Sequence, residues 1–258
     1  MFLFIDMESP VAAERPALAQ RWAAHTLAAK YAVEEVCGDP CLIVRHDRFD
    51  PDMPARLGVR AVLIGGHFTE VGAYPSGARD AVLAWAADPD RPVLGLCGGH
   101  QLIAEAHGGA TGPISTDPAH MEGVPCPSTI DYTTLDHDGP GARFGYLPVE
   151  LTEHGHGHPL FAGLPPSPRL LHLHYWHVAR LPEGFVPLAR SADGVVQAMA
   201  HESRPIFGVQ SHPEGFLPSH PDGRLLLERF LHTDWSLPGD FAALVAADAT
   251  GAFSTHGH

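Results

Sequence analysis

Apolar residues in the first half of the chain form short, unbroken runs that alternate with segments of helical periodicity. Such runs are typical of parallel strands buried on both faces, whereas strands with one exposed face alternate apolar and polar residues. The pattern therefore predicts a three-layer α/β fold, with helices on both faces of a mostly parallel central sheet. The expected strands are 2–6, 41–46, 61–65 and 92–96, and the expected helices are 15–30, 77–87 and 98–107.

The second half of the chain begins with a segment of different composition. Residues 111–142 are rich in proline, glycine, aspartate and threonine and have little periodicity, which predicts a long loop. After it we expect further strands, some of them in a small antiparallel extension, and a last helix. The chain should form one domain over residues 1–234 and a tail over 235–258 that carries one weak helical segment. The expected strands are 146–151, 169–172, 186–190, 195–200 and 206–210, and the expected helix is 222–232.

The charge of the chain limits its partners. Its 258 residues include 16 Lys+Arg and 30 Asp+Glu, for a formal net charge of −14. We therefore expect no binding to nucleic acid or to an anionic membrane surface, because both attract positively charged proteins. The apolar runs are also far shorter than the roughly 20 residues that a membrane-spanning helix needs.

The cysteines indicate a reducing compartment. Cys37, Cys41, Cys97 and Cys126 are too few for a disulfide framework in a chain of this size. One of them, Cys97, lies where a reduced thiol is needed, as the next motif indicates. We therefore expect the protein in the cytoplasm.

The segment from Gly95 to Gln101 has the pattern of a nucleophile elbow. Cys97 follows a predicted strand, precedes a predicted helix and is bracketed by glycines, as a strained strand-to-helix turn requires. The helix N-terminus behind Cys97 favours the thiolate form. The backbone N–H of Gly98 is then placed to bind a developing oxyanion. Cys97 is the candidate nucleophile, in preference to the alternative that it is one more buried apolar residue.

The end of the strand expected at 206–210 supplies a candidate base. His212 and Glu214 follow it, and Pro213 between them ends the strand because proline has no N–H for a sheet ladder. A carboxylate that fixes the tautomer and orientation of a histidine makes it an effective base for a thiol. Parallel sheets place their ligands at the carboxyl ends of the strands, where Cys97 also lies. A third strand ends at Gly65 and Gly66, and the Gly66 N–H is the candidate second oxyanion donor.

Together these motifs resemble the class I (triad-type) glutamine amidotransferases. The resemblance is carried by Gly-x-Cys-x-Gly-His-Gln at 95–101, Gly-Val-Gln-x-His-Pro-Glu at 208–214 and the preceding glycine pair, in that family's order. Weaker similarity lies at 143–149 and 174–190, so the resemblance covers roughly residues 1–233.

The resemblance implies a flavodoxin-like fold and hydrolysis of glutamine to glutamate and ammonia through a thioester at Cys97. It further implies that Gly65, Gln101 and His174 contact the bound glutamine. Domains of this family supply ammonia to an acceptor enzyme, and the sequence has no Gly-x-x-x-x-Gly-Lys phosphate loop. We therefore expect a separate synthase or ligase as partner, and no cofactor.

Two other functions stay open at the level of sequence. The same three residues could serve a self-sufficient γ-glutamyl hydrolase or peptidase, and the chain could also be a catalytically silent subunit with a binding or regulatory role. The histidine-rich run from Glu153 to His158 resembles a metal-binding tract in composition. Its glycines predict a solvated surface loop instead, and no cysteine or carboxylate set completes a tetrahedral site, so we expect no metal.

Overall fold

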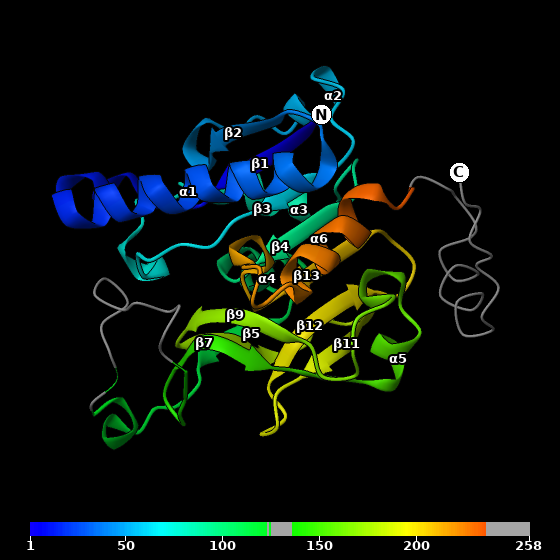
Figure 1. The fold of residues 1–258 in the computed structure, drawn as a ribbon. Coiled ribbons are helices and arrows are strands. Elements are labelled where there is room, and N and C mark those ends of the chain that lie inside the picture. The colour runs from blue at the N-terminus through cyan, green and yellow to red at the C-terminus, as the bar shows by residue number, and fades with distance from the viewer. Residues whose placement is uncertain (123, 125–135, 236–258) are drawn as a thin grey trace.

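The computed structural model describes residues 1–122, 124 and 136–235, and an eight-stranded sheet runs through its centre (Figure 1). The strand order is β2-β1-β3-β4-β13-β12-β11-β8, in which the first five strands are parallel and the last three continue the sheet antiparallel. The parallel part has the flavodoxin-like order. The strands are β1 (Phe2–Asp6), β2 (Cys41–Arg45), β3 (Val62–Ile64), β4 (Val93–Leu96), β8 (Glu150–Leu151), β11 (Phe185–Arg190), β12 (Val196–His201) and β13 (Ile206–Val209).

Helices cover both faces of this sheet, as the unbroken apolar runs predict. Successive side chains of β1 point to opposite faces. Phe2 and Phe4 pack with helices α1 and α6, whereas Leu3 and Ile5 pack with α3 and α4. Figure 1 shows α1 and α6 together on one side of the sheet. The predicted three-layer fold is therefore confirmed, and the helices are α1 (Pro16–Cys37), α3 (Asp80–Ala87), α4 (Gly98–Ala106) and α6 (Asp222–His232).

Two small antiparallel sheets extend the domain, as predicted. One pairs β6 (His137–Asp138), β7 (Arg143–Pro148) and β9 (Arg169–His174), and the other pairs β5 (Ala110–Pro113) with β10 (Trp176–Arg180). The short helices are α2 (Met53–Arg56) and α5 (Glu153–His156). Strands β5 and β6 occupy part of the segment predicted as a loop, and much of the rest of that segment lies outside the described residues.

Three local differences from the sequence predictions have simple causes. Helix α1 continues past residue 30 to Cys37, because the first residue that stops it is Gly38 in the left-handed conformation. Strand β10 was missed because its partner β5 lies more than 60 residues away, with no hairpin turn to reveal the pair. The histidine-rich run is not a solvated loop: Glu153–His156 form the short helix α5, and His158 is buried, which lowers its pKa to about 4.

Trp235, the first residue of the predicted tail, packs in the core. Its indole N–H donates to the carbonyl of Phe230 at 2.8 Å, and its ring centroid lies 4.6 Å from that of Phe207. The rest of the predicted tail, residues 236–258, lies outside the described residues. Within the described part of the chain, no helix is both long enough and apolar enough to cross a membrane.

Candidate active site

Cys97 sits on a strained turn between β4 and α4. Its backbone has φ 51° and ψ −104°, and among the described residues it is the one non-glycine residue with positive φ. The Cys97 N–H donates to the carbonyl of Val209 at 2.8 Å, which fixes the turn beside β13. The helix can approach β3 this closely because position 99 is glycine: a Cβ there would lie 2.0 Å from the Ile64 oxygen. This conformation matches the predicted elbow.

His212 and Glu214 form a buried pair at the end of β13. The backbone N–H of His212 donates to the carbonyl of Leu171 at 2.7 Å, and the ring nitrogen Nδ1 lies 2.7 Å from Oε1 of Glu214. Both residues are 5% exposed. Because Nδ1 is bound to the carboxylate, Nε2 of His212 is the nitrogen left for Cys97.

The charges and hydrogen bonds around His212 and Glu214 favour the charged forms of both side chains. Burial alone would lower the pKa of His212, but the charges of Glu214 and Cys97 and hydrogen bonds to both raise that pKa well above 6.5. Burial would raise the pKa of Glu214, but the His212 charge and hydrogen bond lower it below 4.5. The arrangement therefore favours a positively charged His212 paired with a negatively charged Glu214 at neutral pH.

Gly66 and Gly98 face each other next to Cys97. A Cβ at Gly66 would lie 3.1 Å from Cε1 of His212, 3.3 Å from Cβ of Cys97 and 3.7 Å from the Gly98 nitrogen. Within the part of the chain that the structure describes, neither glycine N–H donates to a backbone carbonyl. Two amides in this position fit an oxyanion hole, and that role stays a prediction.

The three predicted glutamine contacts lie in different surroundings. Gly65 has its N–H bound to the carbonyl of Ile5 at 2.9 Å, so this N–H already has an acceptor. His174 is buried, with Nδ1 3.0 Å from the Trp176 carbonyl and Nε2 3.3 Å from Nδ1 of His172. Gln101 donates from Nε2 to the same Trp176 carbonyl at 2.9 Å. Their contacts with glutamine stay predictions.

His67 is a neighbour of the site that the sequence analysis missed. A Cβ at Gly98 would lie 2.5 Å from Cδ2 and 2.7 Å from Nε2 of His67, so this imidazole fills the space beside Gly98. Nδ1 of His67 lies 2.7 Å from the Thr69 carbonyl, which can only accept, so Nδ1 carries the proton. Burial lowers the pKa of His67, so the ring is neutral with Nε2 as an acceptor. Its one signal in the sequence is its position directly after the glycine pair.

The turn that carries Gly66 and His67 is held by a buried carboxylate. Glu8, just after β1, accepts from the backbone N–H groups of Phe68 at 2.6 Å and Thr69 at 3.3 Å. The first strand thereby fixes the loop beside the nucleophile.

His25 on α1 is a second residue that the sequence analysis missed. Its ring meets the His212 ring edge to face at 5.2 Å, and its Nε2 lies 3.6 Å from Oε1 of Glu214. Burial and the nearby His212 charge lower the pKa of His25 to about 4, so it is neutral at pH 7. Among the described residues, His25, His212 and Glu214 form the one group of possible metal ligands whose ligand atoms all lie within 4.8 Å of one another. They are fewer than the four ligands of a structural zinc site, and His212 and Glu214 already bind each other.

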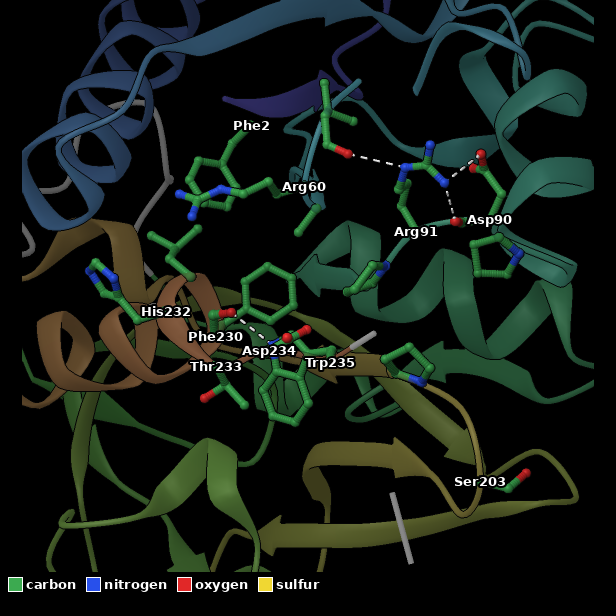
Figure 2. A pocket seen from close by; sticks show the side chains of 16 residues that line it. Phe2, Arg60, Asp90, Arg91, Ser203, Phe230, His232, Thr233, Asp234 and Trp235 are labelled. Carbon is green, nitrogen blue, oxygen red and sulfur yellow. Dashed lines mark hydrogen bonds and ion pairs between the residues drawn. The ribbon is translucent and has the colours of Figure 1, made fainter. Parts of the chain in front are cut away.

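A groove of about 790 Å³ lies away from the candidate active site (Figure 2). Its lining includes the residues at or just before the starts of β1, β3, β4 and β13, so it opens at the sheet edge opposite Cys97. Its two arginines already have partners. Arg60 pairs with Asp39 and stacks over Phe2, and Arg91 pairs with Asp90.

The fold and the site together define a three-layer α/β protein with a cysteine, a histidine and a glutamate gathered at the carboxyl edge of its sheet. Residues 35–233 match the family model described as Glutamine amidotransferase class-I. The chain therefore belongs to the class-I glutamine amidotransferase family, which confirms the resemblance.

Curated relatives agree with this assignment. The chain is 34% identical over 139 residues to a subunit of the glutamine-hydrolysing GMP synthase of Thermococcus kodakarensis, covering 54% of this chain and 59% of that protein. The corresponding Methanosarcina barkeri protein is 37% identical over 55% of this chain and 59% of its own length. The pyocyanine-specific anthranilate synthase component 2 of Pseudomonas aeruginosa is 34% identical over 77% of this chain and 85% of its own.

The chain thus spans a little over half the length of the first of these relatives. Among solved structures, a glutamine amidotransferase of Thermotoga maritima has the same fold. Its TM-score is 0.58 at 13% identity, over 90% of this chain and 98% of that one.

Proposed function

We propose that this chain hydrolyses the side-chain amide of glutamine through a thioester at Cys97 and passes the ammonia to a separate synthase. The observation that carries the proposal is the strained Cys97 turn beside the His212–Glu214 pair, whose nitrogen and oxygen are 2.7 Å apart. Family membership and the names of the relatives, which are subunits or components of synthases, support it.

In the proposed reaction, His212 first holds the proton of the Cys97 thiol, and the thiolate attacks the amide carbon of glutamine. The N–H groups of Gly66 and Gly98 bind the oxyanion that forms on the amide oxygen. His212 then protonates the nitrogen as the C–N bond breaks, which releases ammonia and leaves a γ-glutamyl thioester. The neutral His212 removes a proton from water, which attacks the thioester, and the C–S bond breaks to give glutamate. Glu214 holds His212 in the required tautomer throughout.

The location that fits this chemistry is a reducing compartment such as the cytoplasm. A thiol nucleophile must stay reduced. Cys37, Cys41 and Cys97 are free thiols among the described residues, while Cys126 lies outside them.

The decisive test is glutamate release from glutamine by the wild type and Cys97→Ala, each alone and with a candidate synthase. We expect the substitution to reduce release by about 10⁴-fold or more, because no other group replaces the nucleophile. Cys41→Ala is the matched control: Cys41 is also buried, but it lies on β2, and burial raises its pKa to about 12. We expect it to keep the wild-type rate.

Two results would contradict the proposal. If the wild type released no glutamate with any synthase partner, the chain would be a catalytically silent component. If it cleaved γ-glutamyl amides with bulky leaving groups faster than glutamine, the hydrolase alternative would hold.

A further inference from the structure

The side chain of Gln210 contacts the sulfur of Cys97. Gln210 directly follows β13, and its backbone N–H donates to the carbonyl of Gln197 on β12 at 2.8 Å. The residue is fully buried, at 0% exposed, and its Nε2 lies 3.6 Å from Sγ of Cys97. That distance is within hydrogen-bonding range for sulfur. A polar side chain is therefore buried with one end against the candidate nucleophile.

The orientation of the Gln210 amide follows from a chain of fixed partners. The Trp176 carbonyl can only accept, so the end of Gln101 that lies 2.9 Å from it must be the NH₂ group. The same NH₂ group lies 3.2 Å from the end of Gln210 that faces it, and that end must therefore be the oxygen. The opposite end of the Gln210 amide, which faces Cys97, is then the NH₂ group.

An NH₂ group in this position distinguishes the two protonation states of the sulfur. An amide NH₂ donates but does not accept, and hydrogen bonds to a charged acceptor are stronger than those to a neutral one. The contact therefore stabilises the thiolate more than the thiol. The donor is also permanently oriented, because the Trp176 carbonyl that begins this series of hydrogen bonds cannot change its role.

We propose that Gln210 is a catalytic residue that stabilises the Cys97 thiolate through its side-chain N–H, and that Gln101 is a positioning residue that orients it. The inference rests on the proposed role of Cys97 as nucleophile and deepens it. It also gives Gln101 a role that does not require contact with glutamine. Trp176 contributes through its backbone carbonyl alone.

The test measures the reactivity of the sulfur without glutamine. The full chain is treated with iodoacetamide over a range of pH, and alkylation of Cys97 is followed by peptide mass spectrometry, since the chain has four cysteines. In Gln210→Met, which removes the donor at similar volume, we expect the alkylation rate at pH 7 to fall about tenfold. The midpoint of the rate profile should move to higher pH, while the plateau at high pH stays unchanged. Gln101→Leu should shift the midpoint in the same direction by a smaller amount.

Gln197→Met is the matched control. Gln197 is 2% exposed and lies on the neighbouring strand, but its side chain donates to Ser191 at 3.3 Å instead of to Cys97. We expect its alkylation profile to match that of the wild type. An unchanged profile in a folded Gln210→Met variant would overturn the inference, with folding checked by near-ultraviolet circular dichroism. If that variant does not fold, an unchanged profile in Gln101→Leu overturns it instead.

These outcomes separate the inference from the proposed function. A shifted profile in a chain that releases no glutamate would support the thiolate donor and contradict the glutaminase. Glutamate release with unshifted alkylation profiles would support the glutaminase and contradict the role of Gln210.

Discussion

At the scale of single residues, the site combines a strained backbone with a buried charge pair. The positive φ of Cys97 costs conformational free energy. The hydrogen bond from the Cys97 N–H to the Val209 carbonyl and the packing of α4 must offset this cost. The raised pKa of His212 and the lowered pKa of Glu214 share a cause, because each group stabilises the charged form of the other, and Cys97 adds to the shift of His212. Removing either partner should therefore change both the chemistry and the pH dependence of stability.

Glu214→Gln tests this coupling. It removes one of the two charges that raise the pKa of His212, so that pKa should fall, because burial is then opposed by Cys97 and the remaining hydrogen bonds without the Glu214 charge. The NMR titration of the His212 ring measures the change. Turnover of glutamine should fall by about 10²–10⁴-fold, because the base loses its orientation and charge. Glu35→Gln is the control, since Glu35 is an exposed residue paired with Arg224.

The same pKa gives the sign of the pH effect on stability. Because folding raises the pKa of His212, its stabilising contribution is complete below 6.5 and is lost as pH rises through the raised value. The free energy of unfolding of the wild type should therefore decline as the pH rises from 6.5 through the raised pKa of His212. A decline of equal size in Glu214→Gln would contradict this account.

At the scale of elements, the site depends on how closely α4 approaches β3. The contact of Gly99 with Ile64 leaves no room for a side chain, since a Cβ would lie 2.0 Å from a backbone oxygen that cannot rotate away. This packing sets where the helix N-terminus, and with it Cys97, meets the other strand ends.

Gly99→Ala should therefore lower the free energy of unfolding by about 1–3 kcal/mol, because the helix must shift away from the strand. Urea unfolding followed by tryptophan fluorescence measures the change. Gly72→Ala is the matched control: a Cβ at Gly72 has nothing within 4 Å, so stability should change by less than about 0.5 kcal/mol. Equal stability of the two variants would show that α4 moves at no cost.

At the scale of the whole molecule, one buried cation joins the small sheet to the large one. The side chain of Arg143 on β7 is 5% exposed and binds Asp138 on β6 at 3.0 Å. It also binds Asp193, in the turn between β11 and β12, at 2.5 Å. Both aspartates are 49% exposed, so each pair alone is partly screened by solvent. The buried guanidinium needs at least one of them.

This arrangement predicts strong non-additivity. Asp138→Asn and Asp193→Asn should each cost less than about 1 kcal/mol of unfolding free energy, because the other carboxylate remains. The double variant leaves the buried cation unpaired and should cost about 3 kcal/mol or more. A double-mutant cycle by urea unfolding measures the coupling. Strict additivity would mean that solvent reaches Arg143 and replaces the carboxylates.

Local patterns in the sequence were sufficient for the layers of the fold and for the candidate triad. Unbroken apolar runs report burial on both faces, and Gly95 to Gln101 reports a tight strand-to-helix turn, because each depends on neighbouring residues only. That Cys97 and the His212–Glu214 pair lie close together follows from the rule that the carboxyl ends of parallel strands meet at one edge of a sheet. The sequence also determined the match to the class-I family.

Tertiary structure alone decided which side chains support that triad. His25 reaches Glu214 from a helix near the start of the chain, and Gln101 orients Gln210 across 109 residues of sequence. Such contacts depend on side-chain conformation and on the packing of distant elements, and neither leaves a periodic or local pattern. The sequence thus determined the candidate reacting groups and the edge of the sheet where they meet, whereas the folded core decided the orientation of the groups around them.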